Sequence, residues 1–227
     1  MNRQFIKENR FLLLLLGFTA AGITITGILF HQNFLRILPL YISLTIALLQ
    51  SEVNRYAPLI GGINSVLYGF VYMYYHLYGS AAYAFLVSCP VQIVTFILWQ
   101  RKKWGYSTIF RKMNLKQRIF TAAAFCVALL GMQLVLSQTD ADYIFLDSMV
   151  TLLGILISFL TMFACIEYTG LMLISGIINV ILYLTMMRDA PEQITYLVFS
   201  LYSLICQCLA YRKANMLYLQ QQKEQKQ

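Results

Sequence analysis

The chain has 227 residues, of which 59% are hydrophobic and only 11% are charged, and its formal net charge is +8. Soluble domains average about 25% charged residues and about 45–50% apolar ones, so this composition excludes an ordinary soluble domain and predicts an integral membrane protein. No run of about ten residues alternates between polar and apolar side chains, which argues against a transmembrane β-barrel. We therefore predict an all-α fold.

Eight apolar runs approach the roughly 20 residues that a membrane-spanning helix needs. They cover residues 11–30, 35–50, 57–77, 80–100, 119–137, 144–164, 170–187 and 193–212. The second run spans only if Phe34 or Ser51 is included, and a seven-helix chain with a peripheral first run is the rival count. The first run follows Arg3, Lys7 and Arg10 as in a signal peptide, but it lacks a small-x-small cleavage site, so we expect an uncleaved helix.

Basic residues gather in a few segments. The stretch 101–118 carries seven of the 17 basic residues and no acid. With eight helices, this stretch, both termini and Arg55 share one side, which leaves only Arg36 and Arg188 on the other. Because basic residues collect in short cytoplasmic loops, we predict a multi-pass protein of the cell (inner or plasma) membrane with both termini cytoplasmic. The net charge then reflects topology and not nucleic-acid binding, and 101–118 is expected to be a solvated loop that touches lipid head groups.

Two stretches of the chain nearly repeat each other: GGINSVLY (61–68) and GIINVILY (176–183). The shift of 115 residues that matches Asn64 with Asn179 also matches further polar pairs: Ser43 with Ser158, Glu52 with Glu167, Ser88 with Ser203, and Gln92 with Gln207. We interpret the pattern as an internal repeat. The shift covers an even number of predicted helices, so the two units point the same way through the membrane, as in transporters built from parallel repeats.

The expected organisation is two parallel three-helix repeats joined by a linker helix (3+1+3), with one extra, peripheral helix at the N-terminus. The predicted boundaries are 1–34 for the extra transmembrane helix, 35–100 for the first repeat, 101–142 for the basic cytoplasmic loop and linker helix, 143–213 for the second repeat, and 214–227 for a cytoplasmic tail. We expect this polar tail to be a frayed helix or disordered.

Four amides are predicted near the middle of the bilayer: Asn64, Gln92, Asn179 and Gln207. Asn64 lies about eight residues into its helix, or roughly 12 Å at 1.5 Å per residue, and the hydrocarbon core is about 30 Å thick. Asn64 shares a helix face with Gly61 and Tyr68. A buried amide needs partners, which are either a substrate or a neighbouring helix, where such amides act as structural glue. We predict that Asn64 and Asn179 form two symmetric walls of one substrate site.

Other chemistries lack their motifs. The five cysteines include no C-x-x-C pair and the two histidines are isolated, so we expect no metal site and no cofactor. No H-E-x-x-H or G-x-S-x-G motif is present, which argues against an intramembrane enzyme, and without a phosphate-binding loop in this chain any ATPase must be a separate protein. Glu52, with Arg55 one turn away, and Glu167 are expected in ion pairs or caps at helix ends, so no buried carboxylate relay is predicted.

Longer segments resemble a known family. DSMVTLLGILISFL (147–160), the Asn179 helix and a later apolar helix with Gln207 and a basic tail resemble the C-terminal half of the PnuC vitamin transporters. LYGSAAYAFLVSCPVQIVTFILWQRKKWG (77–105) resembles their first unit. The resemblance covers roughly residues 35–213. It implies a SWEET-like architecture, facilitated diffusion of nicotinamide riboside, thiamine, riboflavin or deoxyribonucleosides, a homotrimer, and a cytoplasmic kinase that traps the substrate.

The family's W-x-x-W-x-x-x-N motif carries over residue by residue. Asn179 matches the Asn, whereas the two Trp positions hold Met172 and Ser175, so the family's aromatic clamp on the nicotinamide ring is missing from its usual place. Gln92 and Gln207 match Gln positions of the family. A different vitamin or nucleoside is therefore nearly as well supported as nicotinamide riboside.

The sequence thus predicts a transporter for a small, largely uncharged, ring-containing vitamin or nucleoside, with Tyr68, Tyr183 or Trp99 in place of the missing clamp. The predicted substrate-binding residues are Asn64, Tyr68, Gln92, Met172, Ser175, Asn179, Tyr183 and Gln207. The alternative is a membrane substrate-binding subunit that needs a separate energising ATPase.

Overall fold

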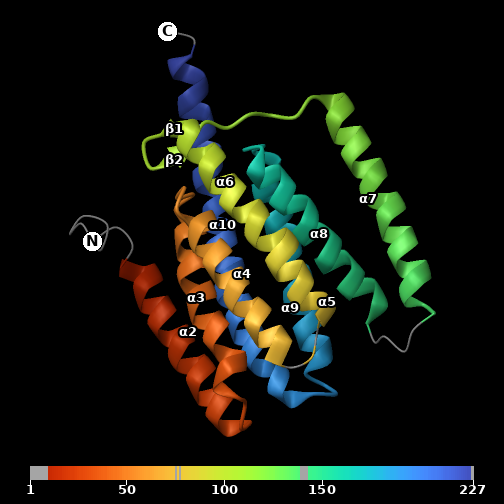
Figure 1. Cartoon of the computed structure of the whole chain (residues 1–227). Helices are drawn as coiled ribbons and strands as arrows, with labels where there is room; N and C mark the ends of the chain where they lie inside the picture. Colours follow the sequence, from red (N-terminus) through yellow and green to blue (C-terminus); the bar gives the residue numbers. More distant parts are fainter. Residues whose placement is uncertain (1–9, 75, 77, 139–142, 226–227) are drawn as a thin grey trace.

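The computed structural model describes residues 10–74, 76, 78–138 and 143–225, and within these ranges the chain is a bundle of long helices (Figure 1). The long helices are α2 (Arg10–Leu29), α3 (Phe34–Ser51), α4 (Ala57–Tyr74), α7 (Leu115–Leu136), α8 (Ile144–Met162), α9 (Glu167–Met186) and α10 (Ile194–Glu224). The fourth predicted helix is formed by α5 (Tyr78–Tyr83), the π-helix η1 (Ala84–Ser88) and α6 (Cys89–Arg101). The predicted all-α fold is confirmed. Arg3 and Lys7, which precede the first predicted helix, lie outside the described residues.

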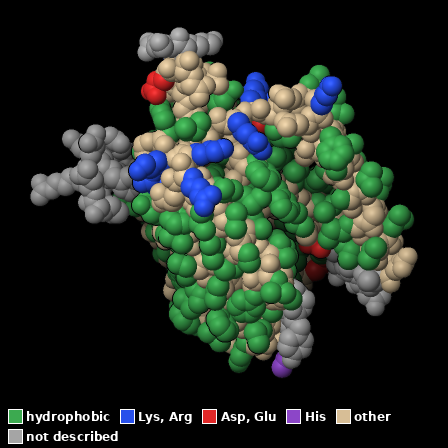
Figure 2. Space-filling model, turned by 45° about the horizontal axis from the view of Figure 1, so that its top comes forward, with side chains coloured by type: hydrophobic (Ala, Val, Ile, Leu, Met, Phe, Trp, Pro, Cys, Tyr) green, Lys and Arg blue, Asp and Glu red, His purple; other side chains and the backbone are tan. Residues whose placement is uncertain are grey.

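The described helices suit a lipid bilayer. Seven of them are long and apolar enough to cross a membrane, and α4, which is as long as α3 at 18 residues, is the eighth of the predicted set. Large apolar side chains face outward; Phe18, Leu86 and Phe120 are each 76% exposed. Lys and Arg side chains gather at one end, above a band of hydrophobic ones (Figure 2). We call this the basic end, and the opposite end of the bundle the far end.

At the basic end, two helix turns have the same backbone geometry. Val53 follows α3 and Ala164 follows α8, and each adopts φ of 52°. In both turns a later amide reaches back into the helix: Asn54 N donates to Leu49 O and Cys165 N donates to Leu160 O, each at 2.9 Å. This is the Schellman type of helix end. These turns are 111 residues apart, so the uninterrupted register of 115 predicted for the repeat does not hold here.

Glu52 and Glu167 accordingly take different places, although the shift of 115 matches them. Glu52 caps the C-terminus of α3, whereas Glu167 is the first residue of α9. Each forms an ion pair, as predicted: Glu52 with Lys213 of α10, and Glu167 with Arg118 of α7 at 2.6 Å. Arg55 is not the partner of Glu52. Arg55 donates to the carbonyl of Gly105 at 3.2 Å, whereas Lys213 donates to the Glu52 carboxylate.

The basic segment 101–118 is not simply a solvated loop. Two short antiparallel strands, β1 (Lys103–Trp104) and β2 (Ser107–Thr108), form a hairpin. Gly105 takes φ of 54° in its turn, which costs glycine no steric strain. The chain then runs inward: Ser107 and Thr108 are 1% exposed, and Phe110 is 5% exposed. The segment packs because its basic side chains point outward while its backbone and Phe110 are covered.

The last helix covers this segment. α10 continues past its predicted end at residue 212 as far as Glu224, so the part of the tail up to that residue is helical. Gln221, which is 4% exposed, lies in this extension. Its Oε1 accepts from Phe110 N and its Nε2 donates to Thr108 O, both at 2.9 Å. We call this arrangement the Gln221 clamp. It gives two buried backbone groups the partners that they require.

Gln221→Ala is expected to destabilise the basic end by about 1–3 kcal/mol, because it leaves the amide of Phe110 and the carbonyl of Thr108 buried without partners. Thermal unfolding would measure the loss of stability, and limited trypsin digestion at the basic residues of the hairpin would measure its exposure. The matched control is Gln220→Ala, at an exposed position next to it. Equal melting and equal digestion of the two variants would contradict the clamp.

The two helices predicted outside the repeats pack differently. α2 lies against α3 and α10, and its Ile23 is fully buried in a core cluster that also contains Leu44 and Tyr202. Gln32, just after α2, donates to Glu192 O at 2.7 Å. α2 is therefore packed firmly, although it contributes no side chain to the cavities described below. The linker helix α7 packs against α8, and none of its described residues is buried.

Candidate functional site

A cavity of about 530 Å³ opens between the helices near the far end. Its wall consists of Arg36, Leu40, Tyr68, Val71, Tyr72, Tyr183, Tyr196 and Phe199. We call it the tyrosine cavity. α4 contributes Tyr68 and Tyr72, whose rings stack at 5.8 Å, and α9 and α10 contribute Tyr183 and Tyr196, which stack at 5.7 Å. Two stacked tyrosine pairs from opposite halves of the chain thus line one space.

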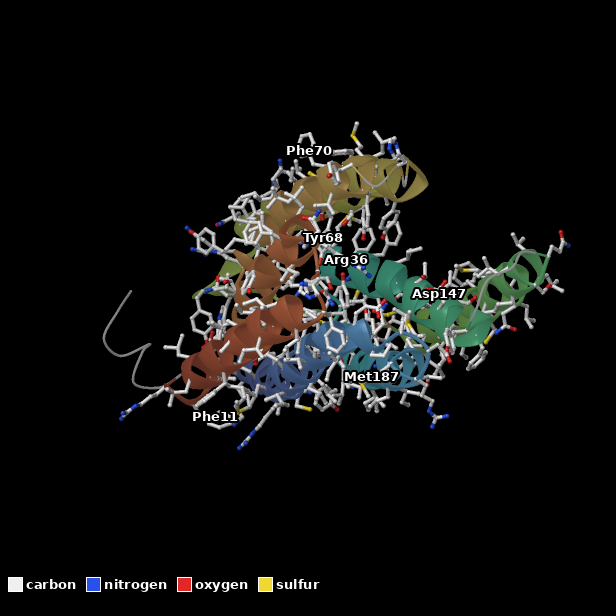
Figure 3. The ribbon with its side chains drawn as sticks, turned by 90° about the horizontal axis from the view of Figure 1, so that it is seen from below. Phe11, Arg36, Tyr68, Phe70, Asp147 and Met187 are labelled. Carbon is white, nitrogen blue, oxygen red and sulfur yellow. The ribbon has the colours of Figure 1, made fainter. Side chains whose placement is uncertain are left out.

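The tyrosine cavity lies inside the bundle. Seen from the far end, Tyr68 and Arg36 lie toward the middle, between the ribbons, whereas Phe70 of the same helix as Tyr68 points outward (Figure 3). Arg36 Nε donates to the hydroxyl of Tyr196 at 2.9 Å, and its guanidinium lies 5.5 Å from the centre of that ring. The arginine is thereby held at the wall of the cavity.

A smaller pocket of about 100 Å³ adjoins the tyrosine cavity, with Tyr183 and Phe199 in the walls of both. Its other lining residues are Gly176, Asn179, Ser200, Ser203 and Gln207. We call it the amide pocket. Asn179 Nδ2 donates to Ser175 O at 2.9 Å, and Gln207 Nε2 donates to Ser203 Oγ at 3.1 Å. Gln207 Oε1 is buried and has no partner among the described residues. A hydrogen-bond acceptor is therefore free at this pocket.

In the first half of the chain, the amides of Asn64 and Gln92 form hydrogen bonds to neighbouring helices. Asn64 is 4% exposed, and its Nδ2 donates to Ser43 Oγ at 2.9 Å and to Pro39 O at 3.3 Å, both on α3. Its Oδ1 is buried without a partner in the described part of the chain. Gln92 Nε2 donates to Ser65 Oγ at 2.9 Å. Asn64 therefore makes the cross-helix bond typical of structural glue and still keeps one free acceptor.

In each of the two similar stretches, 61–68 and 176–183, the first glycine leaves space for a glutamine side chain. A Cβ placed on Gly61 would lie 1.7 Å from Gln92 Oε1, and one on Gly176 would lie 1.9 Å from Gln207 Oε1. Real atoms do not approach so closely, so any larger side chain at either position must displace the carboxamide. The spacing from glycine to glutamine is the same in both halves. These glycines are therefore needed where the glutamine amide rests against the helix.

Gly176→Ala is expected to weaken substrate binding about fivefold, because the methyl group moves the Gln207 amide from its place and costs about one hydrogen bond. The obstructing atom is the end of a flexible side chain, so the melting temperature should change little. Gly154→Ala is the matched control, since a Cβ there meets nothing within 4 Å. Titration of purified protein measures both affinities. Unchanged affinity in Gly176→Ala would show that the Gln207 amide does not contact the substrate.

A third space lies toward the basic end. This basal pocket of about 120 Å³ is lined by Gln50, Val53, Asn54, Ala57, Pro58, Val91, Gln92, Thr95, Trp99, Ile157, Ser158, Thr161, Tyr168 and Met172. Two of these lining residues, Trp99 and Tyr168, pack with Phe110, and the three ring centres are 6.1–6.3 Å apart. Trp99 Nε1 donates to Thr161 O at 2.8 Å and so ties α6 to α8. We call these three rings the basal cluster; it is part of a buried core near the basic end.

The eight predicted site residues therefore lie in different places. Tyr68 and Tyr183 meet in the tyrosine cavity, and Asn179, Tyr183 and Gln207 meet in the amide pocket. Gln92 and Met172 line the basal pocket. Asn64 and Ser175 are buried in helix packing and line none of these three spaces. The prediction that Asn64 and Asn179 form two walls of one site remains a prediction.

Sequence reasoning missed several residues of the tyrosine cavity. Tyr72 lies one helical turn from Tyr68, which is a usable signal, but the aromatic run 68–78 is also typical of an interfacial belt. Tyr196 and Phe199 carry no sequence signal that separates them from ordinary packing. Arg36 was predicted only as one of the two basic residues on the non-cytoplasmic side. The rotation of each helix about its axis decides which of these side chains face inward.

The arrangement suits a small molecule with a flat ring and polar substituents. Tyrosine rings offer apolar faces for stacking and hydroxyl groups for hydrogen bonds, and the amide pocket adds donors and free acceptors at its side. Among the described residues, no group of three or more His, Cys, Asp or Glu side chains is placed to hold a metal ion. Stacking and hydrogen bonding are the interactions that the side chains of the tyrosine cavity and the amide pocket offer.

Comparison with known proteins adds two findings. Residues 33–213 match the family described as "Nicotinamide mononucleotide transporter". The crystal structure of the vitamin B3 transporter PnuC is similar to this structure with a TM-score of 0.74 and 19% sequence identity, over 94% of this chain and 92% of that chain. At this identity the likeness shows a shared fold. No curated protein matches the chain by sequence.

Proposed function

Since this chain belongs to the nicotinamide mononucleotide transporter family, and is a membrane transporter and not an enzyme, we propose that its substrate is a small ring-containing vitamin or nucleoside of the nicotinamide riboside type. The observation that carries this proposal is the tyrosine cavity with the amide pocket at its side. Stacked tyrosines hold a planar ring, and amides hold the hydroxyl groups of an attached sugar.

Each predicted site residue has a part in this proposal. Tyr68 and Tyr183 stack on the ring in place of the family's tryptophan clamp. Asn179 and Gln207 bind its polar substituents. The remaining four residues contact the substrate as it passes toward the basic end: Asn64, Gln92, Met172 and Ser175. The unpartnered Asn64 Oδ1 and Gln207 Oε1 support these assignments, because a buried acceptor without a partner costs free energy that a bound hydroxyl group recovers.

The proposed mechanism is facilitated diffusion with alternating access. The tyrosine cavity lies toward the far end, and the basal cluster is part of a buried core near the basic end, as expected for one state of a transporter that opens to each side in turn. Two acids support uncoupled transport: Glu52 and Glu167 are held in ion pairs at helix ends, and neither lies in the wall of the tyrosine cavity or the amide pocket. Asp147, in the first turn of α8, is a further acid of the described spans and does not line either space.

The proposed setting is the cell membrane, with the basic end and both termini in the cytoplasm. The gathering of Lys and Arg at that end supports this orientation (Figure 2). By the family resemblance, the protein is a homotrimer and a cytoplasmic kinase traps the transported substrate by phosphorylation. These assignments place substrate entry at the far end and release at the basic end.

The first test is a ligand-induced thermal shift of the purified protein. The panel holds nicotinamide riboside, thiamine, riboflavin, ribonucleosides and deoxyribonucleosides, and is repeated on Asn64→Ala and Asn179→Ala. Asn215→Ala serves as the control, since its amide donates within α10 near the basic end. Stabilisation by one class of compound, lost in Asn179→Ala and kept in the control, supports the proposal, and its loss in Asn64→Ala as well supports Asn64 as a second wall of the site. No stabilisation by any compound, with both site variants merely less stable, would mean that the asparagines are structural glue.

A second test separates the facilitator from a binding subunit that needs an ATPase. The protein is reconstituted into liposomes without an ion gradient or ATP, and uptake of the stabilising compound is followed. Saturable uptake supports facilitated diffusion. Tight binding without any uptake would support the binding subunit, since this chain would then need an energising partner.

A further inference from the structure

A groove of about 680 Å³ runs between α7 and the helices α8, α9 and α10. Its wall is formed by Lys112, Met113, Arg118, Thr121, Ala122, Phe125, Cys126, Met149, Leu153, Leu156, Leu160, Ile166, Glu167, Gly170, Leu171, Ile174, Tyr211 and Asn215. We call it the lateral groove. In Figure 1, α7 stands apart from the rest of the bundle and is joined to the hairpin by a long crossing segment. The groove is separate from the tyrosine cavity, the amide pocket and the basal pocket.

The groove changes character along its length. Toward the far end it is lined by apolar side chains such as Phe125, Met149 and Leu153. Toward the basic end it carries the polar and charged side chains, among them Lys112, Arg118 and Tyr211. An apolar groove with charged residues at one end fits an amphipathic molecule whose polar group lies at the membrane surface. In a bilayer the molecules of that form are lipids.

The charges at this end of the groove favour a negative head group. Arg118 is already paired with Glu167 at 2.6 Å, and the same carboxylate oxygen accepts from Met113 N at 3.0 Å. Lys112 has no salt-bridge partner among the described residues, and its side chain is exposed. Basic pockets between membrane helices are known to hold anionic head groups. Glu167 Oε2 is buried and unpartnered in the described part of the chain, and it can accept a hydroxyl group of the head group.

We propose that the lateral groove binds one anionic phospholipid, with its acyl chains between α7 and α8–α9 and its phosphate at Lys112. A head group with hydroxyl donors fits both Lys112 and the free oxygen of Glu167, so phosphatidylglycerol is the probe of choice. The lipid fills the space that separates α7 from the bundle. It adds contacts to those that α7 already makes with α8.

Native mass spectrometry of the purified protein with added phosphatidylglycerol or phosphatidylcholine tests the site. We expect one phosphatidylglycerol per chain. Lys112→Gln should weaken its binding about fivefold, because a basic residue near the head group contributes about 1 kcal/mol. Lys116→Gln, a nearby basic residue that does not line the groove, should bind like the parent.

A steric pair of variants makes the test independent of charge. Ala122 and Ala124 are both exposed on α7, but only Ala122 lines the groove. Ala122→Trp should remove the bound lipid, and Ala124→Trp should keep it, while both chains fold because neither position is buried. Equal retention of phosphatidylcholine, retention of phosphatidylglycerol in Ala122→Trp, or lipid-free multimers that only Ala122→Trp breaks apart would each overturn the proposal. The last result would place a second copy of the chain in the groove.

Discussion

Tyr183→Ala is expected to weaken substrate binding about 5- to 150-fold, because stacking of an aromatic side chain on a ring contributes about 1–3 kcal/mol. Tyr183 is the tyrosine that lies in the walls of both the tyrosine cavity and the amide pocket. It also stacks on Tyr196 at 5.7 Å, so its loss removes one wall and releases the neighbouring ring. Titration with the compound that gives the largest thermal shift measures the effect.

The conservative variant distinguishes stacking from hydrogen bonding. Tyr183→Phe keeps the ring and loses only the hydroxyl group, and its affinity should fall no more than about fivefold, the cost of one hydrogen bond. If Tyr183→Ala bound the compound as tightly as the parent, the tyrosine cavity would not be the substrate site. An equal and large loss in both variants would assign the binding energy to the hydroxyl group and not to the ring.

Trp99→Ala is expected to lower the free energy of unfolding by about 3–5 kcal/mol, as is typical for a large aromatic side chain removed from a core. Trp99 is 3% exposed, packs on Phe110 and Tyr168, and donates to Thr161 O. The variant loses both the ring contacts and the bond that ties the two halves of the bundle. We expect a clearly lower melting temperature and, in liposomes, a pathway that no longer closes at the basic end.

The chain supplies its own control for this substitution. Trp104, the only other tryptophan, is partly exposed and donates to Glu224 Oε2 at 3.2 Å. Trp104→Ala should cost less than about 1 kcal/mol, in line with an exposed hydrogen bond. Similar melting temperatures for the two variants would mean that the basal cluster is not a structural closure. Trp99→Phe should fall between them, since it restores the ring without the N–H group.

Much of the fold could be predicted because its signals are local. The apolar runs predicted the helices to within a few residues, except at the C-terminal end of α10, which continues from the predicted residue 212 to Glu224. The family resemblance is confirmed by the match over residues 33–213. The order of the basic segment and the end of α10 were mispredicted because both depend on contacts across the chain. Gln221 meets Thr108 and Phe110, which lie more than a hundred residues earlier. No local pattern of charge or hydropathy predicts such a contact.

The candidate site was only partly predictable for a related reason. The repeat between residues 61–68 and 176–183 pointed to Gly61 and Gly176, and the amide of a glutamine packs against each of these glycines. The same repeat failed at the turn before α9, because that helix starts earlier than its counterpart and shifts Glu167 into a different position. Tyr72 and Tyr196 were missed because helix rotation is set by packing of the whole bundle, and a single sequence does not specify it.

The Gln221 clamp also has a consequence for how the protein is made. A chain leaves the ribosome from its N-terminus and its parts fold in that order. The hairpin and the segment through Phe110 emerge long before Gln221, so every helix from α7 onward is synthesised while these backbone groups still lack their partners. A nascent chain halted after α9 would already contain most of its membrane helices, but its basic end would lack the two hydrogen bonds of the Gln221 clamp. The basic end is therefore completed only when α10 has been synthesised and Gln221 can bind Thr108 and Phe110.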